Sequence, residues 1–183
     1  MKTTILDACV VLGLLGAAAF VALPVRAEVF VDIGAHGTRV EADLANQSAA
    51  IDSTESGVHL GVGVRRALRA RGDIGARLEL DSVDSNLLLT VRALDYRYHV
   101  SEKLAVGAFF GAARLDLATP AYGYYLGGGV TFKELLPGWD LGVDLRLGDK
   151  VARDNLLPSD PQGARPDNFY DLSGISVYLS HRF

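Results

Sequence analysis

Four histidines and a scatter of serines and acidic residues are the side chains in this 183-residue sequence that could do chemistry. No two of the histidines, His36, His59, His99 and His181, have the spacing of metal ligands on one helix or strand. Each is therefore interpreted as a lone polar residue rather than a ligand. Nucleophilic catalysis would need a serine within reach of a histidine that a carboxylate orients.

Two serine and histidine pairs lie close together in the sequence, Ser180 with His181 and Ser56 with His59. Neighbouring side chains on a strand point to opposite faces, so Ser180 is poorly placed to hydrogen-bond to His181. The aspartates of segment 150–169 lack the alternating acidic positions and the glycine turn of a calcium loop. The sequence therefore predicts no catalytic, cofactor-binding or metal-binding residues.

The first 27 residues differ in composition from the rest. An almost unbroken apolar run over 8–23 follows Lys2 and precedes a short segment that ends at Ala27, which is the layout of a secretory signal peptide. The run is shorter than the ~20 residues that a membrane-spanning helix needs. We therefore predict that residues 1–27 are a cleaved signal peptide and that 28–183 form the mature domain. The only cysteine, Cys9, is removed with the signal.

The composition of the mature chain excludes several kinds of site. It has 156 residues, no cysteine and a net charge of −5. Disulfides and thiolate metal sites are thereby excluded, and nothing resembles the basic face that a nucleic-acid partner requires. The mature chain also contains no stretch of ~18 consecutive apolar residues, so the sequence predicts no transmembrane helix in it.

The mature chain instead alternates apolar with small or polar residues at period two. Valine or leucine occupies the even positions of 57–65, and Arg77, Glu79 and Asp81 lie together on one face of 74–81. This alternation predicts strands with one aliphatic and one polar face. Similar apolar stripes occur in 29–35, 104–112, 122–132, 139–147 and 175–183.

The segment 87–99 needs one extra residue to keep its apolar side chains on one face. Its apolar positions are odd up to Ala93 and even from Tyr96 onward. A β-bulge near Ala93 and Leu94 would join the two frames. The alternative, a single even frame, would turn Arg92 toward lipid at a cost of about 2–4 kcal/mol.

These patterns together predict an all-β fold, an antiparallel up-and-down transmembrane β-barrel of about eight strands. The predicted strands are 29–38, 57–66, 73–82, 87–99, 103–116, 121–133, 139–149 and 170–183. Short periplasmic turns are expected at 67–72, 100–102 and 134–138, and two long polar outer loops at 39–56 and 150–169. Aromatic residues that favour the bilayer interface fall near the strand ends: Tyr96, Tyr98, Tyr122, Tyr124, Trp139 and Phe183.

The polar strand faces distinguish a membrane barrel from a soluble ligand-binding barrel, whose inward face would be apolar. An aliphatic belt this large would aggregate in water, so we expect it to face lipid. The lumen of eight strands has room only for side chains. We expect its arginines, Arg65, Arg77, Arg97 and Arg146, to pair in a buried network with Asp32, Glu79, Asp81, Asp95, Asp140 and Asp144.

The mature chain resembles the small OmpA/OmpX-type outer-membrane barrels, and its end resembles the C-terminal signal that such barrels present to their assembly machinery. That signal is a terminal Phe183 preceded by apolar residues at alternating positions, from which only His181 departs. Segments 139–159 and 169–183 also resemble a family of uncharacterised proteobacterial outer-membrane β-barrel proteins. These resemblances imply fold and location in the cell outer membrane, and transfer no functional residue.

We therefore expect a non-enzymatic outer-membrane protein whose loops bind a partner or which supports the envelope. The expected partners are outer-membrane lipid and lipopolysaccharide, and the barrel-assembly machinery through the strand ending at Phe183. The protein is expected to be a monomer without a nucleic-acid partner or a cofactor. Two alternatives stay open. One is a narrow channel for small hydrophobic solutes, which predicts an apolar inner face near the outer rim. The other is a lipid A-modifying enzyme, which predicts a clustered Ser/His/carboxylate set.

Overall fold

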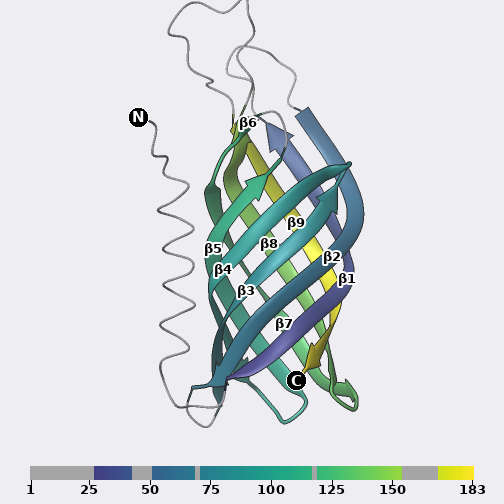
Figure 1. Ribbon diagram of the computed structural model, residues 1–183, viewed down its shortest axis with the longest axis vertical. Coiled ribbons are helices and arrows are strands. Elements are labelled where there is room, and N and C mark those ends of the chain that lie inside the picture. Colours follow the sequence, from purple (N-terminus) through teal and green to yellow (C-terminus); the bar gives the residue numbers. More distant parts are fainter. Residues whose placement is uncertain (1–26, 43–50, 69–70, 117–118, 154–168) are drawn as a thin grey trace, which may run out of the picture.

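A computed structural model describes residues 27–42, 51–68, 71–116, 119–153 and 169–183 of the chain (Figure 1). The predicted signal peptide, apart from Ala27, lies outside the described residues. Among the residues that are described, no helix is long and apolar enough to cross a membrane.

Eight long strands and one two-residue strand form a single antiparallel sheet that closes on itself (Figure 1). Each long strand pairs with the next along the chain, and the last pairs with the first, which confirms the up-and-down barrel. The short β6 only extends the outer end of β8. The strands are β1 (Glu28–Ala42), β2 (Ile51–Ala67), β3 (Gly72–Val83), β4 (Asn86–His99), β5 (Leu104–Leu115), β6 (Thr119–Pro120), β7 (Gly123–Leu136), β8 (Trp139–Arg153) and β9 (Phe169–Arg182).

The two ends of the barrel chain lie at the same end of the molecule, where the backbone N–H of Phe183 donates to the carbonyl of Val29 at 3.0 Å. The connections at this end are short, and β7 turns into β8 over two residues through Gly138, whose φ of +78° is readily adopted by glycine. The longer connections, 43–50 and 154–168, leave from the opposite end. Short turns lie on the periplasmic side of outer-membrane barrels, so that opposite end is the outer one.

Strands β1, β2 and β8 continue past the ends that the sequence predicts for them. The predicted outer loop 39–56 is shorter, because Arg39 to Ala42 pair with Ile51 to Thr54. The predicted loop 150–169 likewise begins later, since β8 runs to Arg153. Apolar side chains alternate along a strand only where its outer face meets lipid, whereas backbone hydrogen bonds between strands can continue beyond that region with any side chains. The pattern therefore located the apolar belt rather than the strand ends.

The predicted β-bulge in β4 is confirmed. Arg92 pairs with Gly111 and Leu94 with Phe110, so Ala93 is the extra residue. The bulge lets Leu87 and Val91 face outward on one side of it and Tyr96 and Tyr98 on the other. Arg92 is fully buried in the lumen as a result.

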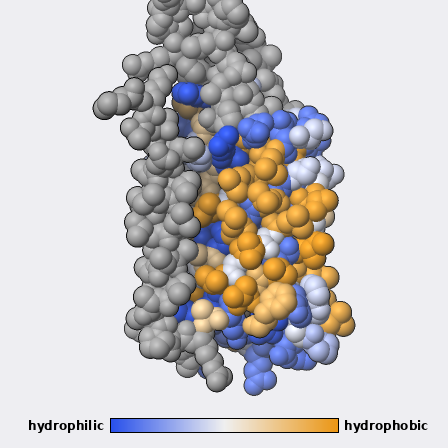
Figure 2. All heavy atoms as spheres, viewed as in Figure 1, coloured by the Kyte–Doolittle hydropathy of each residue, from blue (hydrophilic) through white to orange (hydrophobic). Residues whose placement is uncertain are grey.

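The outer wall carries the aliphatic side chains, as predicted. On the face that Figure 2 shows, apolar residues gather over the middle of the barrel and hydrophilic residues lie toward both ends; the strand pattern continues this apolar belt onto the other strands. Many large apolar side chains on this wall are exposed and others are half-buried, whereas the arginines and carboxylates of the strand centres are buried. This distribution, with apolar side chains outside and charged side chains inside, is that of a barrel whose wall faces lipid and not water.

Gly63 on β2 faces the lumen where no side chain fits. A Cβ atom there would clash with Cζ of Phe30 and lie 2.7 Å from the carbonyl oxygen of Ala76. We expect Gly63→Ala to lower the free energy of unfolding by about 1–3 kcal/mol through overpacking. Gly37→Ala is the matched control, because its Cβ would meet its nearest neighbour at 3.9 Å. Urea unfolding of both variants tests this, and equal midpoints would contradict it.

Candidate functional site

Charged side chains fill the middle of the barrel in a cluster that we call the ion-pair layer. Four guanidinium groups and five carboxylates come from β1, β3, β4 and β8, each with no more than 3% of its surface exposed. Isolated charges cannot be buried at this depth, so their presence requires mutual pairing. The layer consists of Arg77, Arg92, Arg97, Arg146, Asp32, Glu79, Asp81, Asp95 and Asp144.

Asp144 on β8 is the centre of the layer. Arg92 donates to it at 2.6 Å, and Arg97 donates to both of its oxygens at 3.0 Å. The hydroxyl of Tyr178 donates to it at 2.9 Å. Arg92 also lies 2.6 Å from Glu79 and covers one face of the Phe109 ring, 3.5 Å from its centroid. One carboxylate thus links strands β4, β8 and β9 across the lumen.

The periplasmic side of the layer is built around Arg77. Its guanidinium lies 3.0 Å from Asp32 and 3.1 Å from Asp95, so it connects β1, β3 and β4. Arg97 also contacts Asp95, at 2.8 Å. Arg65 lies 3.8 Å from Asp95 with its side chain 13% exposed. Arg65 therefore lies at the periplasmic edge of the layer, where it adds a fifth positive charge to those of the four arginines in the layer.

The outer side of the layer contains two histidines. Arg146 hydrogen-bonds to Asp81 and donates to Thr38 at 2.9 Å. His59 contacts Asp81 at 2.7 Å, and His36 contacts Thr38 at 2.8 Å. All of these side chains point into the barrel. His36 and His59 therefore act as polar fillers of the lumen.

Apolar side chains close the lumen above the ion-pair layer, in a group that we call the apolar cap. They come from the outer ends of β1, β3, β4, β5, β7, β8 and β9, except Phe109, which lies in the middle of β5 against Arg92. The cap consists of Val40, Val83, Leu88, Phe109, Ala113, Leu115, Tyr125, Val151, Ala152, Tyr170 and Leu172, each at most 7% exposed. Within the part of the chain that is described, the layer and the cap together leave the middle of the lumen filled.

The predicted network of buried charges is confirmed for all four of its arginines and for five of its six carboxylates. The prediction was wrong for Asp140, which lies at the periplasmic end and pairs with Arg182 at 3.3 Å. Sequence reasoning did not assign Arg92 to the network, although the bulge already turns it inward. The sequence analysis also did not predict that Tyr170 and Tyr178 are buried in the lumen. Both occupy even positions of β9, on the face opposite the apolar stripe of that strand.

The two serine and histidine pairs do not come together. Ser180 is buried in the lumen, whereas His181 lies on the outer wall. Ser56 is exposed on the wall, and His59 is fully buried inside. In the described ranges, no three His, Cys, Asp or Glu side chains are arranged to hold a metal ion. The geometry thus offers no hydrolytic set at either pair.

His181, the one departure from the C-terminal pattern, has a structural explanation. Its ring lies 4.7 Å from that of Trp139 and meets the ring of Phe183 edge-on at 4.8 Å. Its Nδ1 lies 3.0 Å from the carbonyl oxygen of Gly138 in the β7–β8 turn. Aromatic groups with one polar atom suit the membrane interface. His181 therefore substitutes for an aromatic residue in a cluster at the periplasmic rim.

The closed sheet, the apolar outer wall and the filled polar lumen define the fold class: an eight-stranded antiparallel β-barrel of the transmembrane kind. Solved structures share this fold. Ail, the attachment invasion locus protein of Yersinia pestis, matches with a TM-score of 0.53 and 10% identity over 86% of this chain and 99% of that chain. Ail in complex with the heparin analogue sucrose octasulfate matches with a TM-score of 0.52 and 13% identity, at the same coverage.

No protein-family profile matches this sequence, and no curated protein matches it either. At 10–13% identity, the likeness to Ail shows the fold alone. The resemblance to a family of uncharacterised outer-membrane barrels stays a prediction.

Proposed function

We propose that this protein is a non-enzymatic outer-membrane barrel that holds binding loops at the cell surface or supports the envelope structurally. The observation that carries the proposal is the filled lumen. Paired charges and the apolar cap occupy the space through which a solute would pass. A barrel closed in this way is a rigid scaffold, and binding function on rigid scaffolds resides mostly in their loops.

The outer ends of the strands support a role for the loops. Strands β1 and β2 continue beyond the apolar belt to Ala42 and Ile51, and β8 continues to Arg153. These strands therefore end beyond the belt; the connections 43–50 and 154–168 lie outside the described residues. The proposed partners are outer-membrane lipid with lipopolysaccharide, and the assembly machinery through β9. We propose a monomer.

The first experiment asks whether the barrel resides in the outer membrane and is closed. The full chain is expressed in a Gram-negative host, and its outer-membrane fraction is run on a gel with and without boiling. We expect a heat-dependent shift, and no conductance when the purified protein is added to a planar bilayer. A soluble periplasmic protein, or steady single-channel currents, would contradict the proposal.

The second experiment distinguishes loop binding from structural support. Cells that lack the protein receive the wild-type gene or a gene without 43–50 and 154–168, and outer-membrane permeability to a large hydrophilic antibiotic is measured. Rescue by both genes would indicate a structural role of the barrel. Rescue by the wild type alone, with the heat shift intact in both, would indicate a role of the loops.

The channel for small hydrophobic solutes is a second candidate because the apolar cap provides the apolar inner face that it predicts. The ion-pair layer beneath the cap opposes it, since a hydrophobic solute would have to displace buried charges. Uptake of a labelled aromatic hydrocarbon into vesicles that contain the protein tests this candidate. Uptake no faster than in protein-free vesicles would contradict it.

A further inference from the structure

A pocket of about 240 Å³ lies at the outer mouth of the barrel, on top of the apolar cap. Its lining residues come from the outer ends of β1, β2, β3, β4, β5 and β9, so the pocket spans the lumen. Four members of the apolar cap, Val40, Val83, Leu115 and Tyr170, form its floor. We call this feature the mouth pocket.

Two acidic side chains lie above this floor, Glu55 on β2 and Asp84 in the turn between β3 and β4. Glu55 is directly opposite Thr38, which is buried in the lumen, so Glu55 also faces inward. It is half-buried, whereas Asp84 is exposed at the rim. The side-chain amide of Asn86 donates to the backbone carbonyl of Asp84 at 2.9 Å and fixes the turn. Both carboxylates are therefore positioned by paired strands and a short turn.

These two carboxylates differ from those of the ion-pair layer because no cation lies beside them. Every carboxylate of the layer forms an ion pair with at least one guanidinium group. Among the residues that the structure describes, the carboxylates of Glu55 and Asp84 have no ion-pair or hydrogen-bond partner. The mouth pocket thus contains two negative charges that this part of the chain does not neutralise.

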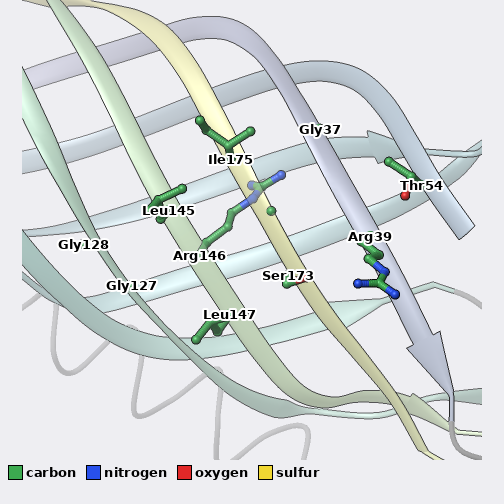
Figure 3. A pocket seen from close by; sticks show the side chains of 11 residues that line it. Gly37, Arg39, Thr54, Gly127, Gly128, Leu145, Arg146, Leu147, Ser173 and Ile175 are labelled. Carbon is green, nitrogen blue, oxygen red and sulfur yellow. The ribbon is translucent and has the colours of Figure 1, made fainter. Parts of the chain in front are cut away.

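The arginines nearest to the mouth pocket pair with other groups. Arg146, in the ion-pair layer, hydrogen-bonds to Asp81 and Thr38. Arg39 lies 3.0 Å from Glu41 and lines a groove that crosses the outer wall, as Figure 3 shows. The described residues that line the mouth pocket include no basic side chain. A positively charged ligand therefore meets no like charge in the pocket.

We propose that the mouth pocket binds a small organic cation from the external medium, an amine whose apolar body is about the size of one ring. The ammonium group pairs with Glu55 and Asp84, and the apolar body lies on the floor beside the ring of Tyr170. The inference goes beyond the proposed function, because it places a binding site in the barrel itself rather than in the loops.

The size and chemistry of the mouth pocket select this class of ligand. Its volume is below the ~300–1,000 Å³ of sites that hold drug-sized molecules, so one ring with a short arm is the limit. Carboxylates accept strong hydrogen bonds from ammonium groups, and an aromatic ring also attracts them. An inorganic cation such as Mg²⁺ would need several oxygen ligands, which an apolar floor does not offer.

A titration followed by nuclear magnetic resonance tests the proposal with phenethylamine as the probe. The full gene is expressed in isotope-labelled medium, and the protein is purified from outer membranes into detergent micelles. We expect saturable shifts of the backbone amide signals of Glu55 and Asp84. Glu55→Gln removes one charge and Ser53→Phe fills the pocket, since Ser53 lines it. Each should raise the Kd at least fivefold.

Two substitutions beside these serve as matched controls. Glu41→Gln removes the same charge from the neighbouring strand β1, where the side chain is 49% exposed on the outer face. Thr54→Phe adds the same ring one position from Ser53, but on the outer wall, where Thr54 lines the groove of Figure 3. Both controls should keep the wild-type Kd within twofold. Phenethyl alcohol, the neutral counterpart of the amine, should give no saturable shift.

Equal shifts in all five proteins would overturn the proposal, because they would reflect partition of the amine into the micelle. Equally tight binding of phenethyl alcohol would overturn the role of the carboxylates. Displacement of the amine by equimolar Mg²⁺ would overturn the assignment to an organic cation. All five proteins are first tested for the heat-dependent shift in outer membranes. If they pass and the amine does not bind, the inference fails while the proposed function stands.

Discussion

Replacing Asp144 by asparagine is expected to lower the free energy of unfolding by about 3–5 kcal/mol, the cost of removing one partner of a buried ion pair. Asp144 accepts hydrogen bonds from Arg92 and Arg97, and the side chains of all three are at most 1% exposed. Without the carboxylate, two buried guanidinium groups lose their shared counterion. Neither can reach water without opening the barrel.

Urea unfolding of the barrel in detergent micelles measures the effect of Asp144→Asn, with the fluorescence of the single tryptophan, Trp139, as the signal. Asp149→Asn is the matched control, because Asp149 lies on the same strand and is exposed. Its effect should stay within about 0.5 kcal/mol. Similar unfolding midpoints for the two variants would show that the ion-pair layer does not hold the strands together.

Leu60→Arg is expected to cost about 2–4 kcal/mol, because it places a charge on the wall near the centre of the belt. Leu60 lies near the middle of β2 and is 46% exposed on the outer face. Ser56→Arg, nearer the outer rim of the same strand, should cost about 0–1 kcal/mol. The penalty falls with distance from the centre because a charge near the rim reaches water.

Folding into phosphatidylcholine vesicles, followed by the gel shift and by urea unfolding, measures this pair. A soluble barrel would show the opposite behaviour, since a charge on a water-facing wall costs little and improves solubility. Equal stability of the two arginine variants would therefore overturn the membrane assignment of the wall.

The rigid lumen and the lipid-facing wall have different roles in this molecule. Burying ion pairs contributes little net stability compared with an apolar core, because desolvation offsets their attraction. The ion-pair layer nevertheless joins β1, β3, β4 and β8 through specific hydrogen bonds. Slippage of one strand would leave several charges unpaired. The layer is therefore suited to specifying the register of a barrel whose wall is uniformly aliphatic.

The sequence by itself determined the barrel, its inside and outside, and the bulge in β4. Each depends on local information, namely the period-two pattern of single strands and the cost of turning Arg92 toward lipid. The buried network was also predictable in outline, because arginines and carboxylates on an inward face must pair.

Only the tertiary structure decided which charges pair, where the strands end, and that a groove crosses the wall. Asp140 and Asp144 are equivalent in the strand pattern, yet one lies at the periplasmic end and the other at the centre of the layer. Gly128 on β7 and Gly37 on β1 are brought into one row of the wall by the register of four strands. Alternation within one strand contains no information about how strands far apart in the chain align.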